Sequence, residues 1–433
     1  MNSNQNKKVF VVTLGCAKNL VDSEYLVTGL KHVGYSMTDN IQQASIVIIN
    51  TCGFLDVARE ESINKIIEIE NKKKEGLIDK VVVMGCLSER YGNELSKEIS
   101  GVDKFFGSEE HEAVIKYISG NPFSLGDPDI IRASLTPSHY SYLKIAEGCD
   151  NACSFCSIPL MRGLQKSQPL RWNIEEAKRL ASRGVKELLV IAQDSTSYGW
   201  DATPKTSLHE LFLELDKIDG LEWLRLHYAH PSNLHREMIK QFSRLDKLIP
   251  YIDMPIQHGS DKMLKMMRRG LKSSGIKKKI EALRKTNENL AIRTSIIVGH
   301  PGETDKEFQE LLDFISDIQF DRLGVFQYSH EENTLAGDTM GDEVSKEIKQ
   351  ERFDQTMALQ QAINFKKNKT LIGTTQKVLI DVSKNSFSLG RTFRDSPTID
   401  NYVKIEKKLD VGKFYDVDIL AAQEYDLIGE VVN

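Results

Sequence analysis

The sequence predicts an α/β protein of three domains: an amino-terminal doubly wound parallel sheet over residues 7–122, a central partial barrel of six βα units over residues 135–366, and a small carboxyl-terminal antiparallel β-barrel over residues 369–433. Val- and Ile-rich runs alternate with helical segments from residue 8 onward, which is typical of a parallel sheet buried on both faces. Six further strand candidates follow, with helical segments in most gaps. In the last domain, short strands separated by turns replace this alternation.

The amino-terminal domain is expected to follow a βαβαβ order. Its predicted strands are KVFVVTL, SIVIIN and KVVVMG, and its predicted helices lie near residues 20–33 and 57–74. Gly34 is expected to end the first helix. Residues 120–139 contain three prolines and little periodicity, so they are expected to form a linker that ends this domain.

The central domain is expected to contain six strands. The candidates are YLKIAEG, ELLVIAQ, LEWLRLHYA, YIDMPIQ, AIRTSIIVG and RLGVFQYS. An open six-stranded barrel and a doubly wound sheet both fit this pattern, and both place their sites at the carboxyl ends of the strands. Asn173 is expected to cap the helix in NIEEAKRLASRG. The predicted strands of the last domain are QKVLIDV, FYDVDIL and DLIGEVV.

The composition is that of a soluble globular protein, with 40% hydrophobic and 27% charged residues. The amino terminus passes from a polar tail into a strand-like run without a signal-peptide core, and no apolar run approaches the ~20 residues that span a bilayer. We therefore expect a cytoplasmic protein without a membrane partner. The net charge of −5 argues against a nucleic-acid partner, which usually leaves a basic footprint.

Three of the six cysteines form a compact motif. Cys149, Cys153 and Cys156 are spaced C-x3-C-x2-C directly after the first predicted strand of the central domain. A cubane iron-sulfur cluster normally takes four cysteines, so three leave one iron open for a ligand that is not protein. An amino acid that carries a sulfonium group can chelate that iron through its amino and carboxylate groups. This places the sulfonium beside an electron donor, which allows its reductive cleavage. The alternatives are buried thiols or a structural zinc site, although zinc usually needs four side chains and no second Cys or His pair follows.

The other three cysteines are far apart in the sequence. Cys16, Cys52 and Cys86 each lie at the carboxyl end of a predicted strand and beside a glycine. Each gap between them is one strand-helix repeat, so right-handed crossovers bring them to one edge of the sheet. The glycines, which would let the backbone approach a bulky inorganic group, are Gly15, Gly53 and Gly85. This pattern predicts a second three-thiolate cluster, and three unrelated buried cysteines are the alternative.

These motifs resemble those of a known family. The spacing C-x3-C-x2-C with Phe155 before the last cysteine is similar to the radical S-adenosylmethionine (SAM) signature, and the three-cysteine first domain resembles that of methylthiotransferases. Within that family the chain resembles the branch that modifies ribosomal protein twelve of the small subunit. The resemblance covers nearly the whole chain, including TLGCAKNLVDSE, INTCGFLDVAREES, VMGCLSERY, YLKIAEGCDNACSFCSIPLMRG, IAQDSTSYG and DMPIQHGSDKMLKMMRRG.

The resemblance implies two [4Fe-4S] clusters and SAM as cofactors, a radical SAM core in the centre and a TRAM module at the carboxyl end. The C-x3-C-x2-C cysteines would bind the cluster that reduces SAM to a 5′-deoxyadenosyl radical, and the other three would bind an auxiliary cluster whose open iron carries the sulfur to be methylated. Phe155 would help to enclose the adenosyl group, with core packing as the alternative. The branch converts an aspartate of its target to β-methylthio-aspartate. No catalytic side chain is assigned, and an electron donor such as flavodoxin or ferredoxin is an expected partner.

Polar residues also lie at the predicted strand ends of the central domain. They are Gln193, Asp194, Gln257 and His258. Barrel enzymes gather ligands there, but each residue could equally satisfy backbone groups, so none is assigned to the site. The chain departs from the pattern of the branch at Ala17, at KSQPLR and at His300, which concern the substrate side and leave the cysteines unchanged.

The substrate is the remaining question, because a sister branch methylthiolates an adenosine of transfer RNA with the same clusters. Residues 370–433 carry ten acidic and eight basic side chains, whereas phosphate binding favours clustered Lys and Arg. This balance favours a basic ribosomal protein, free or in the ribosomal subunit, recognised by charge complementarity, with nucleic-acid contact only through the ribosome. A non-enzymatic iron-sulfur sensor or scaffold and a plain RNA-binding protein are the alternatives from other classes, and both leave the cysteine pattern unexplained.

Overall fold

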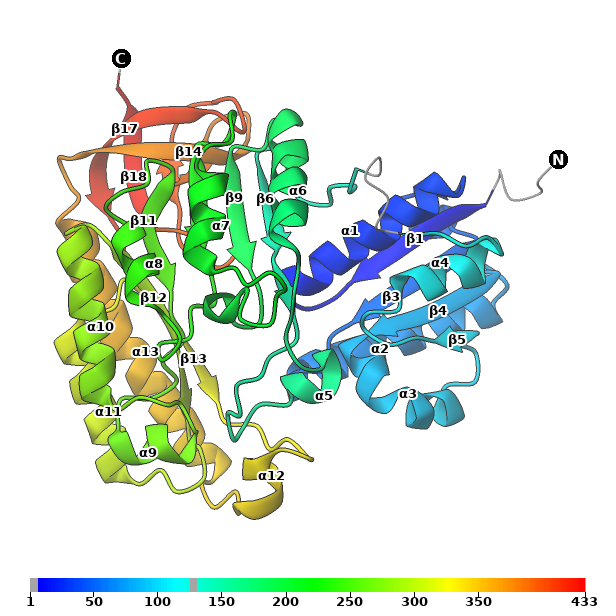
Figure 1. Ribbon diagram of the computed structural model, residues 1–433, viewed down its shortest axis with the longest axis horizontal. Coiled ribbons are helices and arrows are strands. Elements are labelled where there is room, and N and C mark those ends of the chain that lie inside the picture. The colour runs from blue at the N-terminus through cyan, green and yellow to red at the C-terminus, as the bar shows by residue number, and fades with distance from the viewer. Residues whose placement is uncertain (1–6, 125–130, 433) are drawn as a thin grey trace. The chain divides into compact units, whose positions relative to one another are not determined.

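The computed structural model describes residues 7–124 and 131–432, which divide into two compact units (Figure 1). Unit 1 contains the described residues up to Thr136, together with 147–150 and 157–166. Unit 2 contains residues 137–146, 151–156 and everything from Ser167 onward. Part of the predicted linker, residues 125–130, lies outside the described residues.

Unit 1 is built on a five-stranded parallel sheet. Its strands are β1 (Lys8–Thr13), β2 (Ser36–Met37), β3 (Ile46–Thr51), β4 (Lys80–Gly85) and β5 (Lys104–Phe105), in the order β2-β1-β3-β4-β5. All neighbouring pairs are parallel. The order reverses direction between β1 and β3, which is the topological switch point of a doubly wound sheet. The predicted doubly wound fold is confirmed.

Helices cover both faces of this sheet, because the strands alternate apolar side chains between two cores. Ile46 and Ile48 of β3 face one core, and Val47 and Ile49 face the other. The first core is covered by α1 (Ala17–His32) and α4 (His111–Ser119), and the second by α2 (Asp56–Lys74) and α3 (Cys86–Glu98). A short 3-10 turn, η1, spans Ile41–Gln43. Gly34 has a φ of +92° just after α1, as expected for the glycine that ends a helix.

Unit 2 contains a six-stranded parallel sheet in consecutive order. Its strands are β6 (Tyr140–Lys144), β9 (Glu187–Ile191), β10 (Trp223–Leu226), β11 (Leu248–Asp253), β12 (Ala291–Val298) and β13 (Arg322–Gln327). A doubly wound sheet would reverse its order, so the consecutive order selects the open barrel. All six predicted strands are confirmed. The short strands β7 (Ala146–Glu147) and β8 (Lys166–Ser167) pair with each other.

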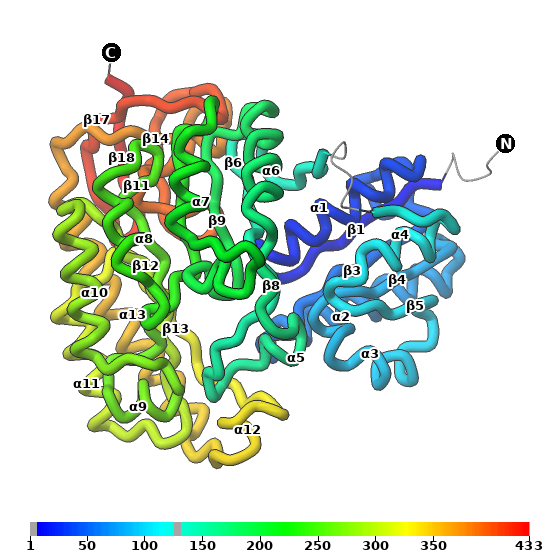
Figure 2. Tube along the Cα trace, in the orientation of Figure 1, coloured from blue at the N-terminus to red at the C-terminus, as the bar shows by residue number. Residues whose placement is uncertain are grey.

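Helices connect the strands of this open barrel, and the chain can be followed through them from green to orange in Figure 2. They are α6 (Leu170–Ser182), α7 (Leu208–Leu215), α8 (Arg236–Gln241), α9 (Asp261–Met266), α10 (Ser273–Thr286) and α11 (Asp305–Ile318), with the 3-10 turn η2 at Ser195–Ser197. Helices α12 (Leu335–Thr339) and α13 (Lys346–Lys369) follow the last strand, β13, and lead to the carboxyl-terminal barrel. The short helix α5 (Ile158–Arg162) belongs to unit 1.

The expected N-cap role of Asn173 is wrong. Helix α6 begins at Leu170, after Pro169, so Asn173 lies inside the helix. Its buried side-chain amide donates to Tyr198 Oη at 3.0 Å. The same amide donates to Gln168 O at 3.4 Å, so the side chain links α6 to Tyr198 and to the segment before the helix.

The carboxyl-terminal barrel closes through five strands. They are β14 (Thr375–Ser383), β15 (Ser388–Arg391), β16 (Val403–Ile405), β17 (Phe414–Ala422) and β18 (Leu427–Val431), in the order β14-β15-β16-β18-β17. The predicted small barrel is present, but it is not wholly antiparallel, because β16 and β18 pair in parallel. Between β16 and β18 the chain forms β17, which runs antiparallel to β18, and this reversal lets β18 run in the same direction as β16.

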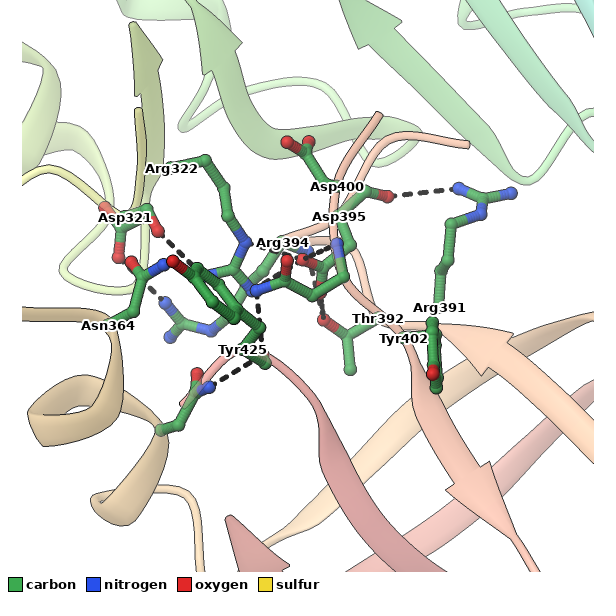
Figure 3. A network of polar contacts seen from close by, with 12 residues as sticks. Asp321, Arg322, Asn364, Arg391, Thr392, Arg394, Asp395, Asp400, Tyr402 and Tyr425 are labelled. Carbon is green, nitrogen blue, oxygen red and sulfur yellow. Dashed lines mark hydrogen bonds and ion pairs between the residues drawn. The ribbon is translucent and has the colours of Figure 1, made fainter. Parts of the chain in front are cut away.

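A loop of this barrel, residues 392–401, packs against the six-stranded sheet. Asp395 accepts a hydrogen bond from Arg322 Nε, at the start of β13, at 2.7 Å (Figure 3). Asp400 accepts from Tyr251 Oη at 2.9 Å and from Arg293 Nε at 3.3 Å. The loop also contacts His227, directly after β10, through Ser396 at 3.0 Å, so it packs along several strands of the sheet.

Across residues 7–124 and 131–432, none of the helices has both the length and the apolar character that a membrane crossing requires.

Candidate functional site

The three distant cysteines of unit 1 follow three adjacent strands. Cys16 is the N-cap residue of α1 after β1, Cys52 follows β3 directly, and Cys86 follows β4 as the first residue of α3. Strands β1, β3 and β4 are neighbours in the sheet, as their labels in Figure 1 show. The cysteines therefore occupy the carboxyl edge beside the switch point, where doubly wound sheets bind their ligands. The predicted convergence on one edge is confirmed.

Glycines let these cysteine loops touch. A Cβ added to Gly15 would lie 2.7 Å from Cys52 Cβ and 3.0 Å from Cys52 Sγ. A Cβ added to Gly53 would lie 2.9 Å from the carbonyl carbon of Cys86. Gly15 also has a φ of +92°, which side-chain-bearing residues rarely adopt. The glycines thus serve the approach of the three loops to one another.

Asn19 ties the same loops together from the first turn of α1. Its buried side-chain amide donates to Leu14 O at 2.9 Å and to Thr51 O at 3.0 Å, so it links the segments before Cys16 and Cys52. Its carbonyl oxygen lies 3.8 Å from Cys86 Sγ. One amide therefore bridges all three cysteine loops.

Burial disfavours free thiolates at the two buried cysteines of this set. Burial raises the pKa of the Cys86 thiol to about 11, and burial also raises the pKa of the Cys52 thiol. The thiolate of Cys16 would raise both pKa values further. A group of thiolates at this place consequently needs compensating positive charge, which iron provides. Part of that charge comes from Arg162, whose Nε donates to Cys86 Sγ at 3.1 Å.

The C-x3-C-x2-C cysteines occupy the loop between β7 and α5. In unit 1, the backbone N–H of Cys149 donates to Gly163 O at 3.1 Å. In unit 2, the N–H of Cys156 donates to Cys153 O at 3.2 Å, and Arg269 Nη1 donates to Cys153 Sγ at 3.1 Å. A buried arginine thus contacts one cysteine sulfur of each set.

Phe155 lies on the same loop and is half-buried. Its ring meets that of His300 edge to face at a centroid distance of 6.4 Å, and the His300 ring in turn lies 5.1 Å from that of Tyr328. His300 and Tyr328 follow the carboxyl ends of β12 and β13. Phe155 is therefore beside strand ends of the open barrel and is not a member of its central core.

Two of the polar strand-end residues have structural partners. His258 is fully buried, donates from Nε2 to Glu303 Oε2 at 3.0 Å, and accepts the N–H of Ser260 on Nδ1 at 3.0 Å, so both ring nitrogens are satisfied. Asp194 follows β9 and accepts hydrogen bonds from Asn151 and Asn233, each at 2.8 Å. Asn151 lies between Cys149 and Cys153 in the sequence, so Asp194 anchors the cysteine loop.

The other two strand-end residues are Gln257 and Gln193. Gln257 has a φ of +76°, a strained conformation for a residue with a side chain, and its backbone bridges to β12. Gln193 lies directly before Asp194 and is half-buried.

The donor set suits cubane clusters. Among the described residues, no three His, Cys, Asp or Glu side chains surround a common point closely enough for a single metal ion. The cysteines of a cubane each bind a different iron, so their sulfurs do not need to meet at one point. Cysteines on three touching loops in one set, cysteines on a single loop in the other, and an arginine N–H donor to one sulfur of each set fit this kind of group.

Comparison with known proteins agrees with this geometry. Three family models match successive parts of the chain: "Uncharacterized protein family UPF0004" over residues 8–107, "Radical SAM superfamily" over residues 143–315, and "TRAM domain" over residues 372–432. The ribosomal protein uS12 methylthiotransferase RimO of Christiangramia forsetii is 45% identical over 99% of this chain and 95% of its own. That of Cytophaga hutchinsonii is 44% identical over 99% of both chains.

The chain belongs to the family of ribosomal protein uS12 methylthiotransferases. The predicted family and branch are confirmed, as is a radical SAM enzyme with a carboxyl-terminal TRAM domain.

Solved structures agree in fold. The radical SAM methyltransferase TsrM from Kitasatospora setae aligns with a TM-score of 0.57 at 15% identity, over 77% of this chain and 74% of its own. The cobalamin-dependent radical SAM enzyme OxsB aligns with a TM-score of 0.52 at 12% identity, over 80% of this chain and 56% of its own.

Sequence reasoning missed three residues of these sites, namely Asn19, Arg162 and Arg269. Asn19 and Arg162 lie three and six residues from a cysteine motif, but Asn and Arg are ordinarily surface residues and carry no spacing signal. Their roles follow from burial: Asn19 is 0% exposed, and the two arginines are 5% exposed. The burial of these side chains indicates their roles, and burial is known only from the three-dimensional structure.

Proposed function

We propose that this protein adds a methylthio group to the β-carbon of an aspartate of ribosomal protein uS12. The observation that carries the proposal is the presence of two separate cysteine sets, one at the carboxyl edge of each parallel sheet, in a chain of the uS12 methylthiotransferase family. One set serves the radical step and the other the sulfur transfer.

In this proposal, Cys149, Cys153 and Cys156 hold the [4Fe-4S] cluster that binds SAM. The bound cofactors supply a carbon-centred radical that can take hydrogen from an aliphatic carbon, which is too weak an acid for a general base. Phe155 encloses the adenosyl side of the site, and its half-buried ring beside His300 supports this assignment. Asn151 and Asp194 hold the cysteine loop against β9.

Cys16, Cys52 and Cys86 hold the auxiliary [4Fe-4S] cluster and with it the sulfur to be transferred. Their place after β1, β3 and β4 and the close approach of Gly15 to Cys52 support this assignment. Three cysteines again leave one iron open. An electron donor such as flavodoxin or ferredoxin completes the system.

The uS12 substrate distinguishes this proposal from methylthiolation of transfer RNA. The carboxyl-terminal barrel carries ten acidic and eight basic residues, but Asp381, Asp395 and Asp400 pair with arginines, as do Arg391 and Arg394 with carboxylates. Seven acidic residues and six lysines remain on the barrel. This near balance does not favour phosphate binding, and recognition of uS12 by charge complementarity stays a prediction.

The test is incubation of the anaerobically reconstituted enzyme with SAM, a sulfide source and a reductant, in parallel with purified uS12, assembled small subunits and unmodified transfer RNA. We expect a methylthio adduct on one aspartate of uS12 by peptide mass spectrometry, together with 5′-deoxyadenosine. A methylthio adduct on transfer RNA alone would establish the sister activity instead. Release of no 5′-deoxyadenosine with any substrate would indicate the non-enzymatic scaffold.

A further inference from the structure

Arg162 is a buried cation in direct contact with a cysteine of the auxiliary set. It is the last residue of α5, it is 5% exposed, and its Nε donates to Cys86 Sγ at 3.1 Å. Arg162 and Cys86 belong to the same unit. The spacing of the cysteines does not require an arginine at this position, so the contact needs a separate explanation.

Both terminal nitrogens of Arg162 also have partners, and these contacts hold the guanidinium in place. Nη1 pairs with Asp22 Oδ2 at 2.7 Å and with Glu147 Oε2 at 3.3 Å, and Nη2 donates to Asn19 Oδ1. A buried guanidinium is costly unless carboxylates compensate it, and two do so here. The fork geometry of arginine then leaves Nε aimed at the sulfur.

Within unit 1, these contacts connect α1 with the two segments that flank the C-x3-C-x2-C motif in the sequence. Asp22 and Asn19 lie on α1, which directly follows Cys16, whereas Glu147 lies two residues before Cys149. Arg162 itself lies six residues after Cys156. The arginine that contacts a sulfur of the auxiliary set is thus supplied by the segment that carries the C-x3-C-x2-C motif.

We propose that Arg162 is a positioning residue of the auxiliary cluster, whose Nε–H···Sγ hydrogen bond stabilises Cys86 as a thiolate ligand and favours the reduced cluster. This inference rests on the proposed auxiliary cluster. Adding one electron makes a cluster more negative, and a hydrogen bond to a ligand sulfur stabilises that added charge. Removing the donor should therefore lower the reduction potential and weaken iron retention.

The test uses the full-length chain with Cys149, Cys153 and Cys156 changed to Ala, which leaves only the auxiliary cluster. In this background, Arg162→Gln removes the charge and the fixed donor, and Arg162→Lys keeps the charge but loses the guanidinium fork. Arg132→Lys is the matched control, since Arg132 is a buried arginine of the same unit that pairs with Glu24. Iron content, the midpoint potential from an EPR-monitored redox titration, and the rate of iron loss to a chelator are measured.

We expect about four irons in the background protein. In Arg162→Gln the equilibrium constant for one-electron reduction should fall about tenfold, which is about 59 mV, and iron should leave faster. Arg162→Lys should show a smaller change in the same direction, and Arg132→Lys should match the background. If Arg162→Gln does not fold, as judged by circular dichroism, Arg162→Lys decides.

A midpoint potential and an iron-loss rate equal to those of the background, in folded Arg162 variants that hold about four irons, would overturn the role of Arg162 and leave the auxiliary cluster intact as a proposal. Absence of iron from the background protein itself would instead contradict the auxiliary cluster. The two failures are therefore distinguishable.

Discussion

At the scale of single residues, the sites depend on polar side chains that are buried and hydrogen-bonded. Asn19 is the clearest case, because its amide links the segments before Cys16 and Cys52 while its carbonyl accepts from Arg162. His258 is a contrasting case, since both of its ring nitrogens are satisfied by neighbours and it serves the structure of the strand end. Identity alone does not separate these roles, whereas hydrogen-bond partners do.

Replacing Asn19 by Leu should loosen the auxiliary site first. Leu14 O, Thr51 O and the Arg162 guanidinium would each lose a partner, and each buried group left unpaired costs about 1–3 kcal/mol. We expect a lower thermal midpoint and loss of auxiliary iron, with 5′-deoxyadenosine release retained. Asn40→Leu, at an exposed turn, is the control. Full iron content in Asn19→Leu would contradict the bridging role.

At the scale of secondary-structure elements, strand order places the chemistry. The switch between β1 and β3 brings Cys16 and Cys52 to one edge, and the consecutive order of the six strands in unit 2 opens a site at their carboxyl ends. The carboxyl-terminal barrel contacts the same sheet through buried ion pairs. Glu187 at the start of β9 pairs with both Arg225 and Arg391, at 2.6 Å and 2.8 Å.

These ion pairs predict how the stability of unit 2 depends on pH. Burial alone would raise the pKa of Glu187, but Arg225 and Arg391 hold it below its ordinary value. The same balance holds the pKa of Asp253 down, through Arg293 and His227, and that of Asp381, through His139 and Arg391. Each folded-state pKa lies below the unfolded value of about 4, so protons bind the unfolded chain first as the pH falls.

The thermal midpoint should therefore be insensitive to these groups above about pH 5 and should fall steadily below about pH 4. Scanning calorimetry from neutral to acid pH measures this slope. Glu187→Gln should lower the midpoint at neutral pH, because it leaves two buried arginines undercompensated, at a cost of about 3–5 kcal/mol. A midpoint in Glu187→Gln equal to that of the wild type would contradict the stabilising role of this cluster.

At the scale of the whole molecule, the two cysteine sets should act separately. Changing Cys149, Cys153 and Cys156 to Ala should lower the iron content from about eight to about four and abolish 5′-deoxyadenosine release. Changing Cys16, Cys52 and Cys86 to Ala should also leave about four irons, but 5′-deoxyadenosine release should continue while no methylthio product forms. Anaerobic iron and sulfide analysis with product chromatography measures both. Identical behaviour of the two triple variants would contradict separate clusters.

Much of this protein follows from its sequence by itself. The alternation of apolar runs and helices indicated the parallel sheets, and cysteines after three successive strands indicated their convergence, because parallel strands with right-handed crossovers leave little choice of edge. The motifs also indicated the family before any fold was known. These features are local in the chain or repeat with its secondary structure, so they are readable in one dimension.

The tertiary structure alone decided the rest. It chose the open barrel over the doubly wound sheet, paired β16 with β18 in parallel, and placed Asn173 inside a helix rather than at its cap. It also brought Arg162 into hydrogen-bond contact with the sulfur of Cys86. Each of these depends on contacts between residues far apart in the chain, where burial and charge compensation outweigh local preference, and such contacts leave no periodic trace in the sequence.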